Sequence, residues 1–232
     1  MAGKKLSVII PVFNEEKTLA ESLARIFKAS VSDYEKEVII IDDGSTDGSL
    51  SVLNEMRSTY PFFLLKHAKN VGKGAAIRSG FKAASGDIVL IQDADLEYDP
   101  SQWQLLLKEF ENPDVLAVFG SRNMNPKRRG YWHYVFGVKL LTMLVNRLFG
   151  SKLTDVYTCY KAFRKSILDG LELKANGFEI EAEITAKLLK KGLAIKEVPI
   201  DYFPRKFFEG KKIKFQDGLK GFWMIVKSRI FR

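Results

Sequence analysis

Acidic side chains stand at every second position of the stretch LIQDADLEYDP, residues 90–100, directly after a run of apolar residues. They are Asp93, Asp95, Glu97 and Asp99. Like charges this close repel one another, so we expect a cation to offset them. Oxygen ligands at alternate positions suit a hard divalent cation. The alternative is a solvated acidic turn, in which Asp99 before Pro100 begins the next helix.

Two familiar metal sites do not fit this chain. An EF-hand loop beginning at Asp93 needs Gly at its sixth position and Glu at its twelfth, where the sequence has Tyr98 and Gln104. Two histidines and one cysteine in 232 residues argue against a zinc site. A hard cation held by oxygen atoms is therefore the metal chemistry that the residues favour.

A second acidic cluster ends the apolar run in IIIDDGSTDGS, residues 39–49, where Asp42 and Asp43 follow three isoleucines. A carboxylate at the end of a strand can accept hydrogen bonds from a ribose or a base. The alternative is a turn rich in Asp, Gly and Ser. No GxGxxG motif follows the first apolar run, and no Walker A motif is present, which disfavours a Rossmann oxidoreductase and a P-loop enzyme.

The elements that must position these residues alternate in type through the first half of the chain. Strands are expected in 5–13, in 37–49 before its acidic loop, in 62–68 and in 87–95. Helices are expected in 14–30, with Asn14 as N-cap, in 50–60 and in 72–85. Buried strands alternating with amphipathic helices predict βαβ units and a parallel sheet covered on both faces.

The polar clusters of the first half all follow predicted strands. They are Asn14-Glu15, Asp42-Asp43, Asn70 to Gly74 and Asp93 to Asp99. Parallel sheets bind ligands beyond the carboxyl ends of their strands. The four clusters are therefore expected to meet in one active site.

The second half differs in charge and pattern. Residues 1–119 carry a net charge of −5 and residues 120–232 a net charge of +14. Its expected elements are an aromatic segment 131–150, a helix 177–192, a strand 194–203, a basic loop 205–215 and a basic amphipathic helix 216–232. This division suggests cation handling in one half and an anionic partner, such as nucleic acid, a phosphorylated substrate or anionic lipid, in the other.

Four segments in order, SVIIPVFNEE, VIIIDDGSTDGS, NVGKGAAIRSGF and GDIVLIQDADLEYDP, resemble a family 2 glycosyltransferase of the GT-A fold. The narrower resemblance is to the dolichyl- or polyprenyl-phosphate mannose synthase group and the related glucosyltransferases. It continues through GSR, LTDVYTCYKAFRK, FEIEAEI, KEVPIDY and RKFFEGKKI, and covers nearly the whole chain. It implies an α/β fold with a mostly parallel, Rossmann-like sheet flanked by helices, and C-terminal amphipathic helices at a membrane interface.

The resemblance also implies roles on the donor side. Asp93 and Asp95 would hold Mg²⁺ or Mn²⁺ against a nucleotide diphosphate, with Glu97 as a third ligand. Many mannose synthases have Gln at that third position, so Glu97 weakens the inference to mannose. The residues expected to bind the donor are Pro11, Phe13, Glu15, Asp42, Asp43, Lys73 and Asp93.

On the acceptor side the resemblance implies a lipid phosphate as nucleophile. Such a phosphate is largely ionised at neutral pH and needs charge compensation more than a general base. Arg122, Arg205 and Lys211 are expected to bind it, because arginine in particular suits phosphate contact. Asp155 would orient acceptor or sugar, or else serve as a cap or salt-bridge partner. The residues expected to act in the transfer are Asp93, Asp95, Arg122 and Asp155.

The implied reaction is an inverting, metal-dependent transfer of mannose or glucose from GDP-mannose or UDP-glucose to dolichyl or polyprenyl phosphate. A soluble or glycan acceptor is the alternative. A non-catalytic module that binds anionic lipid or nucleic acid is disfavoured by the retained Asp93 and Asp95, and nucleic acid is not expected as a partner. The sugar, the isoprenoid length, the choice of metal and the oligomeric state stay open.

The expected organisation is a catalytic domain, 1–215, followed by a basic helix, 216–232. Within the domain, 1–119 forms the nucleotide-sugar half and 120–215 the acceptor half with an interfacial helix at 131–150. No run of 18 apolar residues is present, so we expect no transmembrane helix. Aromatic and basic helices favour an anionic membrane surface, which predicts a cytoplasmic enzyme peripheral to a membrane, although 131–150 could instead pack as ordinary core.

Overall fold

A seven-stranded sheet organises the chain in the computed structural model, which describes residues 4–31, 33–125, 132–205 and 215–230. The strands are β1 (Lys4–Val12), β2 (Tyr34–Asp42), β3 (Phe63–Lys66), β4 (Ile88–Ile91), β5 (Ala117–Ser121), β6 (Lys161–Arg164) and β7 (Ile195–Pro199). Their order is β3-β2-β1-β4-β6-β5-β7. All neighbouring strands are parallel except β6, which runs antiparallel to both β4 and β5.

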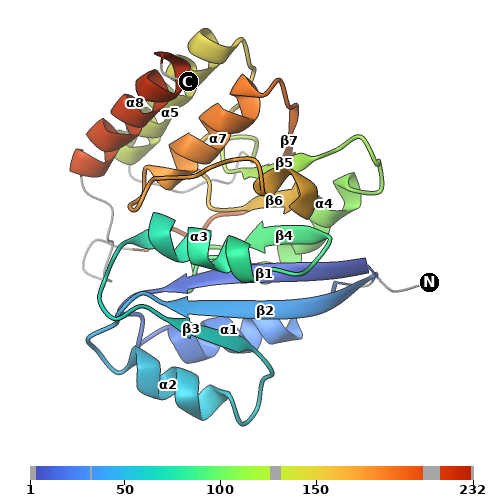
Figure 1. The fold of residues 1–232 in the computed structure, drawn as a ribbon, viewed down its shortest axis with the longest axis vertical. Coiled ribbons are helices and arrows are strands. Elements are labelled where there is room, and N and C mark those ends of the chain that lie inside the picture. The colour runs from blue at the N-terminus through green and yellow to red at the C-terminus, as the bar shows by residue number, and fades with distance from the viewer. Residues whose placement is uncertain (1–3, 32, 126–131, 206–214, 231–232) are drawn as a thin grey trace.

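The helices lie on both faces of this sheet and at one end of it (Figure 1). They are α1 (Leu19–Lys28), α2 (Ser49–Met56), α3 (Lys73–Ala83), α4 (Trp103–Glu109), α5 (Trp132–Phe149), α6 (Lys165–Leu168), α7 (Ile180–Lys190) and α8 (Phe215–Ile230). A short 3₁₀ turn, Pro100–Gln102, precedes α4. The α/β class and the mostly parallel sheet that the sequence predicts are confirmed.

The alternation of side chains along a strand decides which helix covers which face. Ile9 and Ile41 point to one face, where Gly80 lets α3 approach so closely that an added Cβ would lie 2.3 Å from the Ile9 side chain. Lys36, of the opposite parity in β2, reaches the Ile26 carbonyl oxygen of α1 at 2.8 Å. Because both faces are covered, β1 and β2 read as continuous apolar runs.

Two sequence-based boundaries are wrong. Asn14 is not a helix N-cap, because α1 begins at Leu19 with Thr18 before it. Instead Asn14 has a φ of 51° and its side-chain oxygen accepts the Thr46 backbone N–H at 2.8 Å, which ties the first loop to the second. The fourth strand ends at Ile91 rather than at 95, so both aspartates of the Asp-x-Asp pair lie in the loop beyond it.

Helices α5, α7 and α8 pack side by side at the end of the sheet farthest from β3 (Figure 1). They enclose a second apolar cluster, which contains Leu141, Val145, Leu153, Val156, Ala182 and Ile225. One face of α5 therefore packs as core, as one of the two sequence interpretations expected. Across the described ranges, we find no helix whose length and apolar character would let it span a bilayer.

Candidate functional site

A pocket of about 640 Å³ opens where β1 and β4 end and α3 and α7 begin, a volume in the range of small-molecule sites. The sequence-predicted residues that line it are Pro11, Phe13, Glu15, Asp43, Lys73, Asp93, Asp95, Glu97, Arg122 and Arg205. Asp42 and Asp155 do not line it, and Lys211 lies outside the described residues. The fold thus brings most of the predicted residues together from both halves of the chain.

Arg205 brings a positive charge to the Asp-x-Asp loop. Its Nη2 lies 2.6 Å from Asp95 Oδ2, and its Nη1 lies 3.0 Å from Glu15 Oε2. Glu97 accepts a hydrogen bond from the Arg205 backbone N–H at 2.7 Å and another from the Tyr202 hydroxyl at 2.8 Å. The repulsion expected between the neighbouring acids of this loop is therefore offset by the guanidinium of Arg205.

The two aspartates of the pair have opposite electrostatic surroundings. Burial, with the charges of Asp93 and Glu97, raises the pKa of Asp95 to about 8, although Arg205 opposes the shift. Burial acts in the same direction on Asp93, but Lys73 at 2.7 Å outweighs it and holds the pKa of Asp93 below its usual value. A further positive charge near Asp95 would favour its ionised form.

The donor atoms of this loop fit Mg²⁺ or Mn²⁺ in chemistry, since they are carboxylate oxygens next to one another in a buried pocket. As the side chains stand, the described part of the chain contains no group of three or more His, Cys, Asp or Glu residues arranged to hold a metal. Instead, Lys73 forms an ion pair with Asp93, and Arg205 forms one with Asp95. A divalent ion at Asp93 and Asp95 would have to displace or rearrange these cations.

Arg122 and Asp155 form a buried, two-pronged ion pair. Arg122 Nε and Nη2 donate to the two Asp155 oxygens at 2.6 and 2.8 Å, and the Arg122 backbone N–H adds a third bond. Glu197 of β7 accepts the backbone N–H groups of Thr154 and Asp155, which fixes the loop. Asp155 thus has the salt-bridge geometry that was one of its two sequence interpretations, and it orients Arg122 at the pocket wall.

Asp43 organises a loop of the pocket through its carboxylate. The carboxylate accepts the backbone N–H groups of Val71 and Gly72 and the Asn70 amide, and it lies 2.6 Å from His67 Nδ1. Asp42 accepts the Ser45 backbone N–H at 3.1 Å. Both aspartates therefore shape turns beside the pocket.

Sequence reasoning missed several residues that line or support the pocket, of which four matter most for its charge and shape. Tyr157, Tyr202 and Glu181 line it, and Lys161 lies behind Glu181 with no exposed surface. The signal for Glu181 was present in FEIEAEI, where acids recur within a buried helix. A charged residue almost never lies fully buried without a partner, so those acids pointed to cations elsewhere in the chain.

Comparisons with known proteins bear on this site. The sequence model described as "Glycosyl transferase family 2" matches residues 7–171. A protein named dolichol-phosphate mannosyltransferase, from Pyrococcus furiosus, is 33% identical over 213 residues, which are 89% of this chain and 59% of that protein. An undecaprenyl-phosphate 4-deoxy-4-formamido-L-arabinose transferase from Pseudomonas fluorescens is 34% identical over 171 residues. These residues are 72% of this chain and 48% of that protein. The chain therefore spans only about half of the length of these curated relatives.

A solved structure supports the fold. Glucosyl-3-phosphoglycerate synthase from Mycobacterium tuberculosis, crystallised with Mn²⁺, UDP and glucosyl-3-phosphoglycerate, matches with a TM-score of 0.74 at 21% identity, over 98% of this chain and 81% of that one. The same enzyme with Mg²⁺ and UDP matches with a TM-score of 0.72. At this identity the likeness concerns the fold alone, and it confirms the GT-A architecture that the sequence predicts.

Proposed function

The chain belongs to glycosyl transferase family 2 and is a glycosyltransferase, and on this basis we propose that it transfers a hexose, mannose or glucose, from a nucleotide sugar to a polyprenyl phosphate at a membrane surface. Both curated relatives carry a prenyl phosphate in their names, dolichol phosphate and undecaprenyl phosphate. The chain's 1–119 half would bind the donor and its 120–215 half the acceptor.

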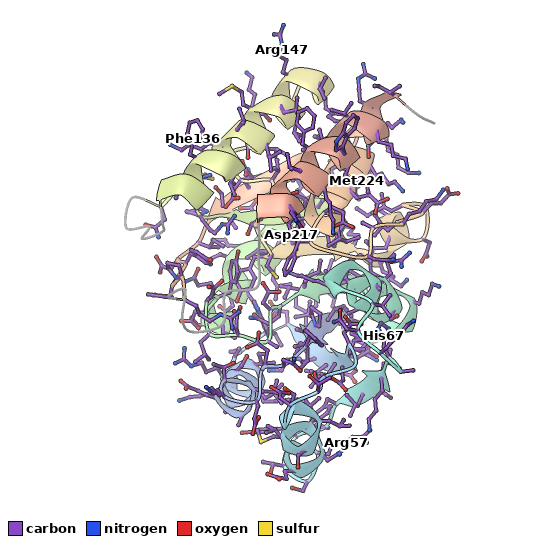
Figure 2. All side chains as sticks on the ribbon, turned by 90° about the vertical axis from the view of Figure 1, so that its left-hand side faces the viewer. Arg57, His67, Phe136, Arg147, Asp217 and Met224 are labelled. Atoms are coloured by element: carbon purple, nitrogen blue, oxygen red, sulfur yellow. The ribbon has the colours of Figure 1, made fainter. Side chains whose placement is uncertain are left out.

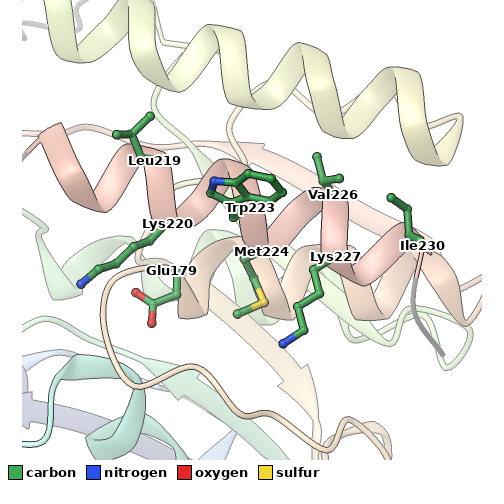
Figure 3. Close-up of a pocket in the computed structure, with 8 residues that line it drawn as sticks. All are labelled: Glu179, Leu219, Lys220, Trp223, Met224, Val226, Lys227 and Ile230. Carbon is green, nitrogen blue, oxygen red and sulfur yellow. The ribbon is translucent and has the colours of Figure 1, made fainter.

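An acidic pocket that shares two of its lining residues with an apolar groove carries this proposal. Asp93, Asp95 and Glu97 line this pocket from the loop beyond β4, and Lys220 of α8 and Glu179 also line it. The last two residues also line an apolar groove along α8, whose other members are Leu219, Trp223, Met224, Val226, Lys227 and Ile230 (Figure 3). The diphosphate of a donor beside the acids, and the apolar tail of a separate prenyl phosphate along the groove, would match these surfaces.

The reaction we infer is a single displacement. An oxygen of the acceptor phosphate attacks the anomeric carbon, the bond from that carbon to the donor diphosphate breaks, and the nucleoside diphosphate leaves with the bonding electrons. One displacement inverts the anomeric carbon, so an α-linked donor gives a β-linked product. No proton has to be removed from the nucleophile, because a phosphate monoester is already ionised at neutral pH.

The chain's own residues handle the charges of this step. Asp93 and Asp95, with Glu97, would hold Mg²⁺ or Mn²⁺, which supplies charge stabilisation to the departing diphosphate. Lys73 at the start of α3 lies beside Asp93 and would contact a diphosphate oxygen. Arg122, held in orientation by Asp155, and Arg205 would bind the acceptor phosphate.

We also propose that α5 and α8 bring the pocket to an anionic membrane. Phe136 and Met143 of α5 and Trp223 of α8 are each about two-thirds exposed, at 64%, 65% and 66%. Basic residues accompany them, and Figure 2 shows Phe136 and Arg147 projecting outward from α5. Exposed aromatic and basic side chains together favour the interface of an anionic bilayer.

Transfer of labelled sugar tests the proposed function. Purified protein is incubated with radiolabelled GDP-mannose or UDP-glucose, Mn²⁺ or Mg²⁺, and a polyprenyl phosphate in detergent. We expect label to enter the organic phase with one donor, only when acceptor and metal are both present, and the product to have a β-linkage by its NMR coupling constant. Label that stays in water on a soluble acceptor, or an α-linked product, would overturn the proposal.

A further inference from the structure

A row of alternating charges runs from the core of the protein into the wall of the pocket. Lys161 Nζ on β6 lies 2.5 Å from Glu181 Oε2 on α7. Glu181 Oε1 lies 3.2 Å from Lys73 Nζ, which in turn lies 2.7 Å from Asp93 Oδ1. The order of charges is positive, negative, positive, negative, and the row joins three different elements to the Asp-x-Asp loop.

The inner end of this row is rigidly anchored. Lys161 has no exposed surface, and its ammonium donates to the carbonyl oxygens of Val156 and Thr158 as well as to Glu181. An ammonium has three N–H donors, so each has a partner. Glu181 is 3% exposed. Its partner Lys161 holds it in place, because Lys161 cannot move away without leaving a buried charge unpaired.

The outer end of the row faces the pocket. Lys73 is the first residue of α3, lines the pocket and has two carboxylate partners, Asp93 and Glu181. Lys73 therefore lies, paired with two carboxylates, where the sequence resemblance implies the donor.

The two partners of Lys73 are not equivalent once a divalent ion binds. An ion held by Asp93 neutralises that carboxylate and repels the Lys73 ammonium at close range. Glu181 then remains as the counter-charge of Lys73, and its own position is fixed by Lys161. Without Glu181 the flexible four-carbon stem of Lys73 would let the ammonium turn away from the pocket.

We propose that Glu181 is a positioning residue, which holds the Lys73 ammonium in place against the diphosphate of the donor when a divalent ion occupies the Asp-x-Asp loop. Lys161 holds Glu181 in turn. The inference rests on the proposed function, because it requires a nucleoside diphosphate in the pocket. It adds to that function a reason why the protein keeps a wholly buried lysine behind its active site.

The test compares a nucleoside diphosphate with its monophosphate. Dissociation constants of GDP, GMP, UDP and UMP are measured by calorimetry in Mn²⁺ for the wild type, Glu181→Gln, Lys73→Met and the double variant. In Glu181→Gln the preference for diphosphate over monophosphate should fall about tenfold, because Lys73 loses a charge-assisted contact with the diphosphate. In the Lys73→Met background the same Glu181→Gln change should alter that preference by less than about twofold.

A merely structural role for Glu181 would give a different result. It would weaken diphosphate and monophosphate equally, or would act as strongly without Lys73 as with it, and either result overturns the proposal. Glu183→Gln is the matched control, because Glu183 is a buried acid on the same helix that binds Lys187 and the backbone of Lys174 outside the pocket. It should reduce stability and leave the diphosphate preference unchanged.

Two further variants keep the test decisive if Glu181→Gln does not fold. Lys161→Met with Glu181→Gln removes both members of the buried pair, so no uncompensated charge remains in the core, and it should show the same loss of diphosphate preference. Glu181→Asp keeps the charge but shortens its reach and should lose part of that preference. Wild-type protein that binds none of the four nucleotides would overturn the proposed function itself, which is a result distinct from unchanged preference in the variants.

Discussion

Arg205 Nη2 lies 2.6 Å from Asp95 Oδ2, so a cation of the chain itself occupies a carboxylate that is expected to hold a divalent ion. The two residues are 110 positions apart in the sequence. Arg205 also pairs with Glu15, which places one guanidinium between two acids that line the pocket. A metal ion bound at Asp95 would therefore compete with this guanidinium for the same carboxylate.

We predict that Arg205→Ala binds Mn²⁺ more tightly than the wild type when no nucleotide is present. Removing the competing guanidinium frees Asp95 and Glu15, and we expect a gain of about tenfold, equivalent to about 1.4 kcal/mol. Electron paramagnetic resonance of free Mn²⁺ measures the affinity. Arg25→Ala, which removes an exposed arginine of α1, is the control and should leave the Mn²⁺ affinity unchanged. Equal or weaker Mn²⁺ binding by Arg205→Ala would show that the two cations do not compete.

Asp95→Asn should strongly reduce metal-dependent transfer while the protein stays folded. The substitution keeps the shape of the side chain but removes a charged metal ligand, and we expect kcat/KM to fall by about 10²–10³-fold, the usual cost of losing one preorganised charge-stabilising group. Asp99→Ala is the matched control. Asp99 accepts the Ser101 backbone N–H at 2.9 Å as a helix-start residue, so its loss should cost about 1 kcal/mol of stability and spare activity.

The effects of Asp155 on stability and on transfer activity should be separable by mutation. Asp155→Ala leaves Arg122 buried without its partner and should lower the free energy of unfolding by about 3–5 kcal/mol. Arg122→Met with Asp155→Leu removes both charges and should recover much of that stability in urea unfolding. Recovery of transfer activity in this double variant would contradict the proposed contact between Arg122 and the acceptor phosphate.

The free energy of unfolding should decrease at acidic pH because Glu37, a buried residue of β2, becomes protonated. Burial alone would raise its pKa, but hydrogen bonds from Lys5, Ser7 and Ser85 lower the pKa to about 2 from an ordinary 4.5. A carboxyl group with a lowered pKa stabilises the fold fully above its unfolded pKa and loses that effect as pH falls from about 4.5 towards 2. The contribution at neutral pH is about 3 kcal/mol.

Urea unfolding of the wild type and of Glu37→Gln at several pH values measures this effect. The difference in unfolding free energy between the two proteins should be largest at pH 7 and should shrink below pH 4.5. The exposed Glu35→Gln, on the same strand, serves as control and should track the wild type at every pH. A difference that stays constant down to pH 3 would rule out the assigned shift.

Membrane binding should depend on the outward aromatic residues of α5 and α8. Phe136→Ala with Trp223→Ala should reduce flotation with anionic liposomes at least about tenfold, since burying one such side chain is worth about 1.5–3 kcal/mol. Raising the salt concentration should weaken flotation of the wild type, because basic residues contribute. Leu105→Ala, which truncates an exposed leucine on α4, is the control. Unchanged flotation of the double variant would exclude these helices as the contact surface.

The parallel half of the sheet could be predicted because its strands are buried on both faces and read as uninterrupted apolar runs. β5 and β6 could not, since each is short and β6 contains Lys161, a charge in the middle of the core. A fully buried lysine reads as a surface residue in the sequence. Only its partner on α7, 20 residues further along the chain, explains its place.

The sequence by itself determined the family, the fold class and the Asp-x-Asp loop, because these depend on local patterns and on the rule that parallel strands end at one edge. It also placed Asp99 at a helix start, which the structure confirms. The tertiary structure decided which cation meets which acid: Arg205 with Asp95, Lys73 with Glu181, and Arg122 with Asp155. Such pairs join distant elements, and a charge becomes buried only where folding brings its partner within a few ångströms.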